Sequence, residues 1–503
     1  MKKFLAVLLS LSFILPLPAF AADQADLLQK MEALSKELDR LKQQMQEMQK
    51  KETVKEERIK VVEKKAEKAA EPSWLEIGGD YRFRMDNLKG KTHDANVQGT
   101  GVSGRYLAND TLLTNRFGLN FKAEAIEDIE VKARLLMYKL WGMDRADSVT
   151  NSGNGSNGFF ADKNSIFDAN IGHTPQDNTL RVDQVYVTWS DIGGAPVWLS
   201  VGRRPSTGGV PTNMRQNREK VGTAGVPGFL VDWAFDGATL GYAPDIKALP
   251  GAYAKLCYGK GFESGLRANN GLKDTDMLGI NVVPYDTNNL HFELQWNKAY
   301  NIMASATDVR GSANTNVGDV DQYGAIVMGK IDSVGPGDLN LFLAGAMSKT
   351  KPNTNKYNST WGLLWDDYEG KKGRTGNVIY LGGRYDIKST LTKIGVEYNR
   401  GSKNWLAFAP ASDDMWTTKL GTRGDVYEVY IIQELNKKPI SKSGKAFFRL
   451  GYQLYDFTYT GSQNWLGAPY RINDLTRTGP GTMQMFQPVK TAKDIYLTFD
   501  VLF

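Results

Sequence analysis

The chain has 503 residues, of which 41% are hydrophobic and 11% aromatic, and its mean hydropathy is −0.40. This length exceeds one ordinary soluble core, and the formal net charge of +6 is too small to indicate a nucleic-acid partner. The single cysteine, Cys257, excludes a disulfide framework, a cysteine-rich zinc site and a covalently attached c-type haem in this chain.

The N-terminus has the pattern of a secretory signal peptide. Lys2 and Lys3 precede an apolar run over residues 4–15, which is too short to cross a bilayer. The letters AFA end at Ala21 and form an A-x-A cleavage site. We therefore expect residues 1–21 to be a signal peptide, with a retained anchor as the alternative.

Residues 22–72 predict a long helix. Apolar residues from Leu27 to Met48 recur with alternating gaps of four and three, which is the a/d spacing of a coiled-coil heptad. A helix alone in water has no reason to keep a strict apolar seam. We therefore expect self-association through residues 27–69, with a trimer suiting a trimeric body. The alternative is a lone amphipathic spacer that lies on another surface.

From Trp74 onward the hydrophobic period changes from 3.5 to 2, which predicts β-strands with one apolar and one polar face. The stretch WLEIGGDYRFRMD (residues 74–86) alternates apolar residues with charged ones. The last ten residues, DIYLTFDVLF, also alternate, and their apolar face runs from Ile495 to Phe503. A strand with one apolar face at the end of a chain needs an apolar surface to lie on.

Connections between the predicted strands alternate between short and long. The short turns are residues 124–130, 190–196, 243–251, 285–289, 333–338, 387–390 and 434–444. The long loops are residues 87–110, 142–178, 205–227, 261–273, 301–320, 351–376, 401–424 and 460–488. Seven short turns and eight long loops separate sixteen strands, and this alternation is typical of outer-membrane barrels.

The sequence therefore predicts an all-β fold over residues 73–503: a transmembrane antiparallel β-barrel of about sixteen strands, preceded by a periplasmic α-helical coiled coil. Only the lipid face of a barrel must be apolar, which explains the low mean hydropathy. Five tryptophans at or near strand ends fit aromatic girdles: Trp74, Trp141, Trp189, Trp198 and Trp296. The alternative is a water-soluble β-sandwich.

Several segments resemble known porins. The plan of signal, periplasmic coil and about sixteen strands is similar to that of phosphate-selective and related substrate-specific trimeric porins. The segments WLEIGGDYRFRMD, VDQVYVTW, VGRRPST, EYNRGSKNW, KLGTRG and FRLGYQLYDFTY resemble a family of β-barrel porins from metal- and sulfur-reducing bacteria. The terminal strand resembles the signature that outer-membrane proteins present to their insertion machinery. These resemblances imply an outer-membrane barrel and do not identify a solute.

Basic residues on the first three strands are candidates for the pore lining. On the predicted lumen face these are Arg82, Arg84, Arg116, Lys122, Lys132 and Arg134. Clustered Lys and Arg favour anions. Acidic residues share these strands, however, among them Glu76, Asp80, Glu124 and Glu130. A transverse field across a general pore and simple charge pairing therefore remain open as alternatives to anion selection.

The third long loop is a candidate constriction. In porins the third loop commonly folds inward, so this expectation rests on the resemblance. The loop holds Arg215, Arg218 and Lys220, and Arg203 and Arg204 come just before it.

We expect an outer-membrane porin through which small hydrophilic solutes diffuse, with a slight preference for anions and a periplasmic coil. The three histidines are too dispersed for a metal cluster, and no Ser/His arrangement suggests an enzyme, so neither a metal nor a cofactor is expected. One alternative is a sleeve for a periplasmic partner such as a multihaem cytochrome conduit, which needs a wide lumen without an inward loop. A second is an envelope tether, which predicts a plugged barrel.

Overall fold

The computed structural model describes residues 36–37, 40, 74–142, 175, 177–266, 271–304, 315–409, 413–478 and 483–503. The chain divides into two compact units, Met1–Ser73 and Trp74–Phe503. The predicted signal peptide lies outside the described residues, and so does the predicted coiled coil except for Lys36, Glu37 and Arg40, which are helical. Within the described part of the chain, no helix is both long and apolar enough to span a bilayer.

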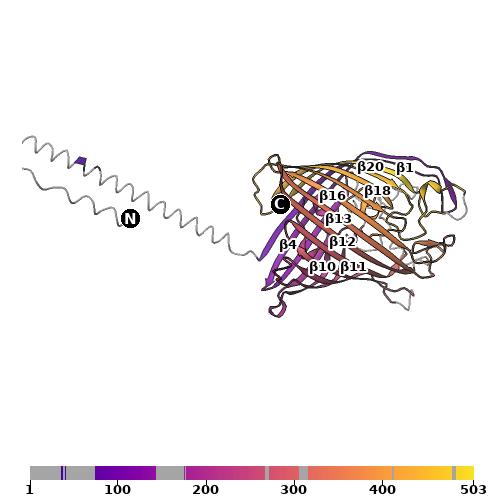
Figure 1. The fold of residues 1–503 in the computed structure, drawn as a ribbon, viewed down its shortest axis with the longest axis horizontal. Coiled ribbons are helices and arrows are strands. Elements are labelled where there is room, and N and C mark those ends of the chain that lie inside the picture. The colour runs from indigo at the N-terminus through magenta and orange to yellow at the C-terminus, as the bar shows by residue number, and fades with distance from the viewer. Residues whose placement is uncertain are drawn as a thin grey trace, which may run out of the picture. The chain divides into compact units, whose positions relative to one another are not determined.

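Sixteen strands form one closed antiparallel barrel, so the predicted fold class is confirmed (Figure 1). The barrel strands are β1 (Leu75–Thr92), β4 (Tyr106–Ile126), β5 (Ile129–Leu140), β6 (Arg181–Trp189), β7 (Val197–Ser206), β8 (Trp233–Tyr242), β9 (Tyr253–Phe262), β10 (Thr275–Asp286), β11 (Leu290–Met303), β12 (Asn316–Val334), β13 (Gly337–Pro352), β16 (Thr375–Ile387), β17 (Thr392–Gly401), β18 (Gly424–Glu434), β19 (Lys445–Phe457) and β20 (Val489–Leu502). Each barrel strand pairs with the next along the chain, and β1 pairs with β20 to close the ring.

The remaining described elements are short. Two small hairpins stand in the connections: β2 (Ala95–Val97) with β3 (Thr100–Val102), and β14 (Trp361–Gly362) with β15 (Trp365–Asp366). The helical elements of the barrel unit are η2 (Ile192–Gly194), α3 (Thr212–Arg215), η3 (Gly222–Ala224), η4 (Lys419–Gly421) and η5 (Ile472–Asp474).

Side chains alternate between the outer and inner faces of the strands, as period two requires. In β1, Ile77 is 62% exposed on the outer face, whereas Arg82 and Arg84 are buried on the inner face. In β20, Ile495 is exposed outside and Asp494 is buried inside. Along the middle of these two strands the outer face is therefore apolar, and the charged residues point inward.

Short turns and long loops lie where the alternation predicted them, apart from shifts of a few residues at their ends. The largest shift is at the first long loop, predicted over residues 87–110. Strands β1 and β4 extend into that range, so only residues 93–105 connect them. The strands continue because Leu88 and Leu112 pack on the inner face against Trp416. Buried apolar contacts thus stabilise the ladder beyond the predicted strand ends.

The predicted aromatic girdles are correct for three of the five tryptophans. Trp74, Trp141 and Trp189 are exposed by 45–68% at strand ends. Trp198 instead points inward, where its ring packs 5.6 Å from the guanidinium carbon of Arg204. Trp296 lies in the middle of β11, paired with Ile280. Trp198 thus fails the prediction by its face, whereas Trp296 keeps the outer face of Leu294 and fails only by its distance from the strand ends.

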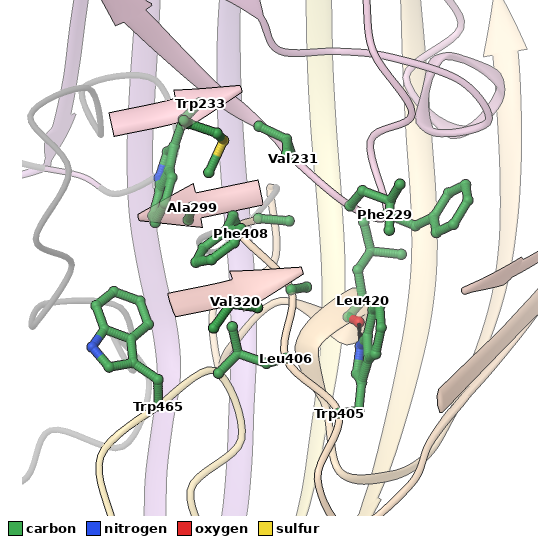
Figure 2. Packing of buried hydrophobic residues seen from close by; sticks show 14 of the residues in the cluster. Phe229, Val231, Trp233, Ala299, Val320, Trp405, Leu406, Phe408, Leu420 and Trp465 are labelled. Carbon is green, nitrogen blue, oxygen red and sulfur yellow. Dashed lines mark hydrogen bonds between the residues drawn. The ribbon is translucent and has the colours of Figure 1, made fainter. Parts of the chain in front are cut away.

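The hydrophobic core lies inside the barrel, because two long connections fold inward. We call residues 207–232 the first inner loop, and residues 402–409 with 413–423 the second inner loop. The backbones join, since Asp232 N–H donates to Phe408 O and Phe408 N–H donates to Leu230 O, both at 2.8 Å. Around this joint Phe229, Trp233 and Trp405 pack with residues of the barrel wall (Figure 2).

Candidate pore constriction

The first inner loop reaches across the barrel interior and is fixed by ion pairs to three distant strands. At the end of α3, Arg215 Nη1 lies 2.5 Å from Asp414 and 3.2 Å from Glu428 of β18. Arg218 lies 3.2 Å from Asp80 of β1. Lys220 pairs with Asp286 at the end of β10. The loop therefore contacts opposite parts of the wall and narrows the lumen between them.

The second inner loop presents Asp413 to a cluster of arginines. Arg82 Nη1 donates to Asp413 Oδ1 at 2.5 Å, and Arg449 Nη2 lies 3.1 Å from Oδ2. Arg84 and Arg116 each lie 3.8 Å from the same carboxylate. Burial alone would raise the pKa of Asp413, but these guanidinium groups outweigh it and hold the pKa well below its usual range. Asp413 therefore stays ionised inside the barrel.

The two inner loops form one packed body. Arg215 of the first loop binds Asp414 of the second, and the buried Lys419 side chain pairs with Glu397 and Glu428 of the wall. The Trp405 indole Nε1–H donates to Leu420 O at 2.7 Å, which ties the second loop to itself (Figure 2). Displacing one loop would therefore expose buried charges and apolar side chains of the other.

All six predicted pore-lining residues lie on the inner side of β1, β4 and β5, and each has a carboxylate partner. Arg82 and Arg84 are buried, and they pair with carboxylates of the second inner loop, β1 and β20. Arg116 shares Asp413, and Arg134 lies 2.7 Å from Asp80. The remaining pairs are Lys122 with Glu124 and Lys132 with Glu130. The six residues therefore do not form a wall of free positive charge.

The five predicted constriction residues separate into two groups. Arg215, Arg218 and Lys220 lie in the first inner loop and make the wall contacts described above. Arg203 and Arg204 belong to β7. Arg203 pairs with Asp236, which is 57% exposed, whereas Arg204 is buried on the opposite face.

Sequence reasoning missed the second inner loop. This loop places Asp413, Asp414 and Lys419 at the centre of the buried ionic network. The signal was the composition of residues 404–409, NWLAFA, since a loop this apolar is unusual when it is exposed to water. Composition alone does not indicate where such a loop packs.

Acidic and histidine groups elsewhere are also paired. The Asp367 carboxylate binds Lys356, and Glu369 binds Lys403 and Arg374. His291 lies 3.0 Å from Asp286 and 3.1 Å from Glu293. Among the residues that the structure describes, no group of three His, Cys, Asp or Glu side chains is suited to a metal ion.

The family model described as "Protein of unknown function (DUF3373)" matches residues 106–503. The chain belongs to this family. No curated protein matches it. The match covers fifteen of the sixteen barrel strands and both inner loops, leaving out β1.

Solved structures with a similar architecture are bacterial porins. OprB of Pseudomonas putida has 12% identity and a TM-score of 0.43, over 85% of this chain and 94% of that one. An anion-selective porin from Comamonas acidovorans has 12% identity and a TM-score of 0.41, over 85% and 99%. OmpF of Salmonella typhi, complexed with daunomycin, has 9% identity and a TM-score of 0.41, over 85% and 97%. Likeness at this level says nothing about solute, and the fold rests on the strand pairing described above.

Proposed function

We propose that this DUF3373 chain is an outer-membrane porin through which small hydrophilic solutes diffuse. The observation that carries the proposal is a closed barrel with an apolar outer face and a charged interior, narrowed by inward loops. A closed barrel leaves no unpaired edge for lipid, and its interior can remain wet.

We propose that the passage runs beside β4 and β5. The neighbouring side of the interior, along β1, β20 and β18, is filled, since Arg84, Asp494 and Glu428 are all less than 5% exposed. The side chains of Lys122 and Lys132 are 32% and 38% exposed although they face inward. Inner side chains that reach water mark the part of the lumen that the loops leave free.

Anion preference is proposed as slight. At the constriction the cation is the more exposed member of two ion pairs. The Arg218 side chain is 31% exposed against 4% for Asp80, and Lys220 is 28% exposed against 18% for Asp286. A solute would meet the cations first, but pairing leaves little net charge to select with.

Planar-bilayer conductance in a KCl gradient tests this proposal. We expect steady openings with a small reversal potential of the sign for anions. Deletion of residues 209–231 should increase single-channel conductance, whereas Arg400→Gln, a charge change at an exposed site on β17, should not. A silent barrel in both forms would contradict a porin.

The inner loops favour a porin over a partner sleeve, since a sleeve needs a wide lumen. An envelope tether is the second candidate. A tether predicts a plugged barrel, and the two inner loops are densely packed inside this one. A silent wild-type channel, together with loss of envelope linkage on deleting residues 23–71, would favour the tether.

We also propose trimer formation through residues 27–69, which cross-linking of the full chain with and without that segment would test.

A further inference from the structure

One buried arginine of the interior lacks a carboxylate partner. Arg204 of β7 is 8% exposed, and among the described residues no carboxylate lies within 4 Å of it. Its Nε donates to Ser200 Oγ at 2.8 Å and its Nη1 donates to Thr239 Oγ1. The rings of Trp198 and Tyr186 lie 5.6 and 5.9 Å away. Two hydroxyls and two aromatic rings only partly replace the solvation of a guanidinium.

Arg423 shows how the same barrel accommodates another arginine without a nearby carboxylate in the described structure. Its Nε, Nη1 and Nη2 donate to the backbone carbonyls of Trp405, Thr460 and Asn464 at 2.8–3.0 Å. Each of its nitrogens therefore has an acceptor. Arg204 differs, since its Nη2 has no acceptor among the described residues. Protein acceptors therefore account for the whole guanidinium of Arg423, but among the described residues they leave Nη2 of Arg204 without a hydrogen bond.

The side chain of Arg204 lines a cavity of about 40 Å³ between β7 and β11. This volume is enough for about three water molecules, since one needs roughly 10–15 Å³. Ser206, Thr239 and Asn297 supply polar groups to the wall, and Phe235 and Met277 supply apolar ones. Within the described part of the chain, no acidic residue lines the cavity.

A second unmatched donor belongs to this cavity. Asn297 is 3% exposed, and its Nδ2 has no acceptor among the residues that the structure describes. A chain of amides fixes its orientation, starting at the Glu293 carboxylate, which only accepts. Asn281 Nδ2 donates to Glu293 Oε1 and Gln295 Oε1, both at 2.6 Å, and Gln295 Nε2 donates to Asn297 Oδ1 at 2.5 Å. This direction leaves the NH₂ group of Asn297 as a donor without an acceptor.

A further positive charge lies close by. On the inner face, Ser200 of β7 is in register with Thr239 of β8, and Thr239 is in register with Cys257 of β9. The next inward residue of β9 is Lys255, which therefore lies near the two hydroxyls that bind Arg204. Lys255 is 3% exposed, and its ammonium donates to the carbonyls of Thr223 and Gly225 in the first inner loop. Among the described residues it also has no carboxylate within 4 Å.

We propose that this cavity binds a monovalent anion of halide size. Arg204 Nη2 and Asn297 Nδ2 are the donors, and a bound anion would compensate the guanidinium and satisfy both nitrogens. The apolar part of the wall favours a small, weakly hydrated ion over a phosphate. The site does not depend on conduction, so it stands or fails apart from the proposed porin function.

Crystals of the full chain grown with sodium bromide test the site directly. We expect an anomalous bromide peak within hydrogen-bonding distance of Arg204 and Asn297. It should be lost in Arg204→Gln and retained in Arg400→Gln, which removes one cation at an exposed site. Ordered water in the cavity, with bromide peaks only at the outer surface, would overturn the proposal.

Thermal unfolding in detergent gives an independent readout. Replacing sodium gluconate by sodium bromide at equal ionic strength should raise the wild-type midpoint, because gluconate is too large for the cavity. The increase should disappear in Asn297→Asp, whose carboxylate would repel an anion while keeping the size of the side chain. If Arg204→Gln does not fold, this second variant still decides the matter. Equal midpoints in both salts for the wild type would contradict the site.

Discussion

Basic residues alternate in the same way along β1 and β5, yet the two strands differ in what surrounds those residues. In β1 the Arg82 and Arg84 side chains are at most 3% exposed and pair with buried carboxylates. In β5 the Lys132 side chain is 38% exposed and pairs with Glu130 of its own strand. The β1 arginines bind the second inner loop, whereas Lys132 of β5 is exposed to water. Equal sequence patterns on one barrel wall can thus serve anchoring or solvation, depending on which loop covers them.

The largest effect on this comparison should come from Asp413→Asn. It leaves Arg82, Arg84 and Arg449 buried around a neutral amide, which should cost about 3–5 kcal/mol of unfolding free energy. Urea unfolding of the barrel in lipid vesicles would measure it. Asp110→Asn, which breaks an exposed pair with Lys89, should change stability by less than about 0.5 kcal/mol. If Asp413→Asn and Asp110→Asn changed the unfolding free energy equally, the buried ion pairs of Asp413 would contribute no more to stability than an exposed pair.

A smaller effect is expected for the link between the two inner loops. A double-mutant cycle of Arg215→Gln and Asp414→Asn should give a coupling free energy of about 2 kcal/mol, because both groups are buried and 2.5 Å apart. Single-channel conductance should rise in each single variant, since either change frees the loops. Additive free energies would contradict the single packed body described above.

The exposed pairs should matter little for stability and more for selectivity. Lys122→Gln and Lys132→Gln should each change the unfolding free energy by less than about 0.5 kcal/mol, because water screens both pairs. Each should move the reversal potential towards cations in a KCl gradient. Lys89→Gln, another exposed lysine, serves as the control. An unchanged reversal potential would place the passage elsewhere in the barrel.

The smallest effect should be that of mild acid on the buried cluster. The pKa of Asp413 is held well below its usual range by Arg82, Arg449, Arg84 and Arg116. Its contribution to stability is therefore complete above the unfolded pKa of about 3.9 and declines only as pH falls below that value. The difference in stability between wild type and Asp413→Asn should stay constant from pH 8 to about pH 5. A difference that shrinks near pH 6 would show that Asp413 is not held in this way.

Much of the barrel could be predicted because its determinants are local. Outer and inner faces follow from the alternation around Ile77, Arg82 and Arg84, and loop lengths follow from where that alternation stops. The prediction failed for the face of Trp198, which points inward, and for the place of Trp296, which faces outward but lies in the middle of its strand. For the candidate constriction, the chemical nature of the residues was predictable and their partners were not.

The sequence by itself determined the all-β class, the strand count and the polarity of each face, since period two needs only neighbouring residues. Tertiary structure alone decided which charges would be neutralised. Asp413 meets Arg82 across 331 positions of the chain, and Arg215 meets Glu428 across 213. Such pairs form only when closure of the barrel and inward folding of the loops bring distant segments together. The cavity beside Arg204 has the same origin, because the residues that line it come from β7 to β11 and the first inner loop.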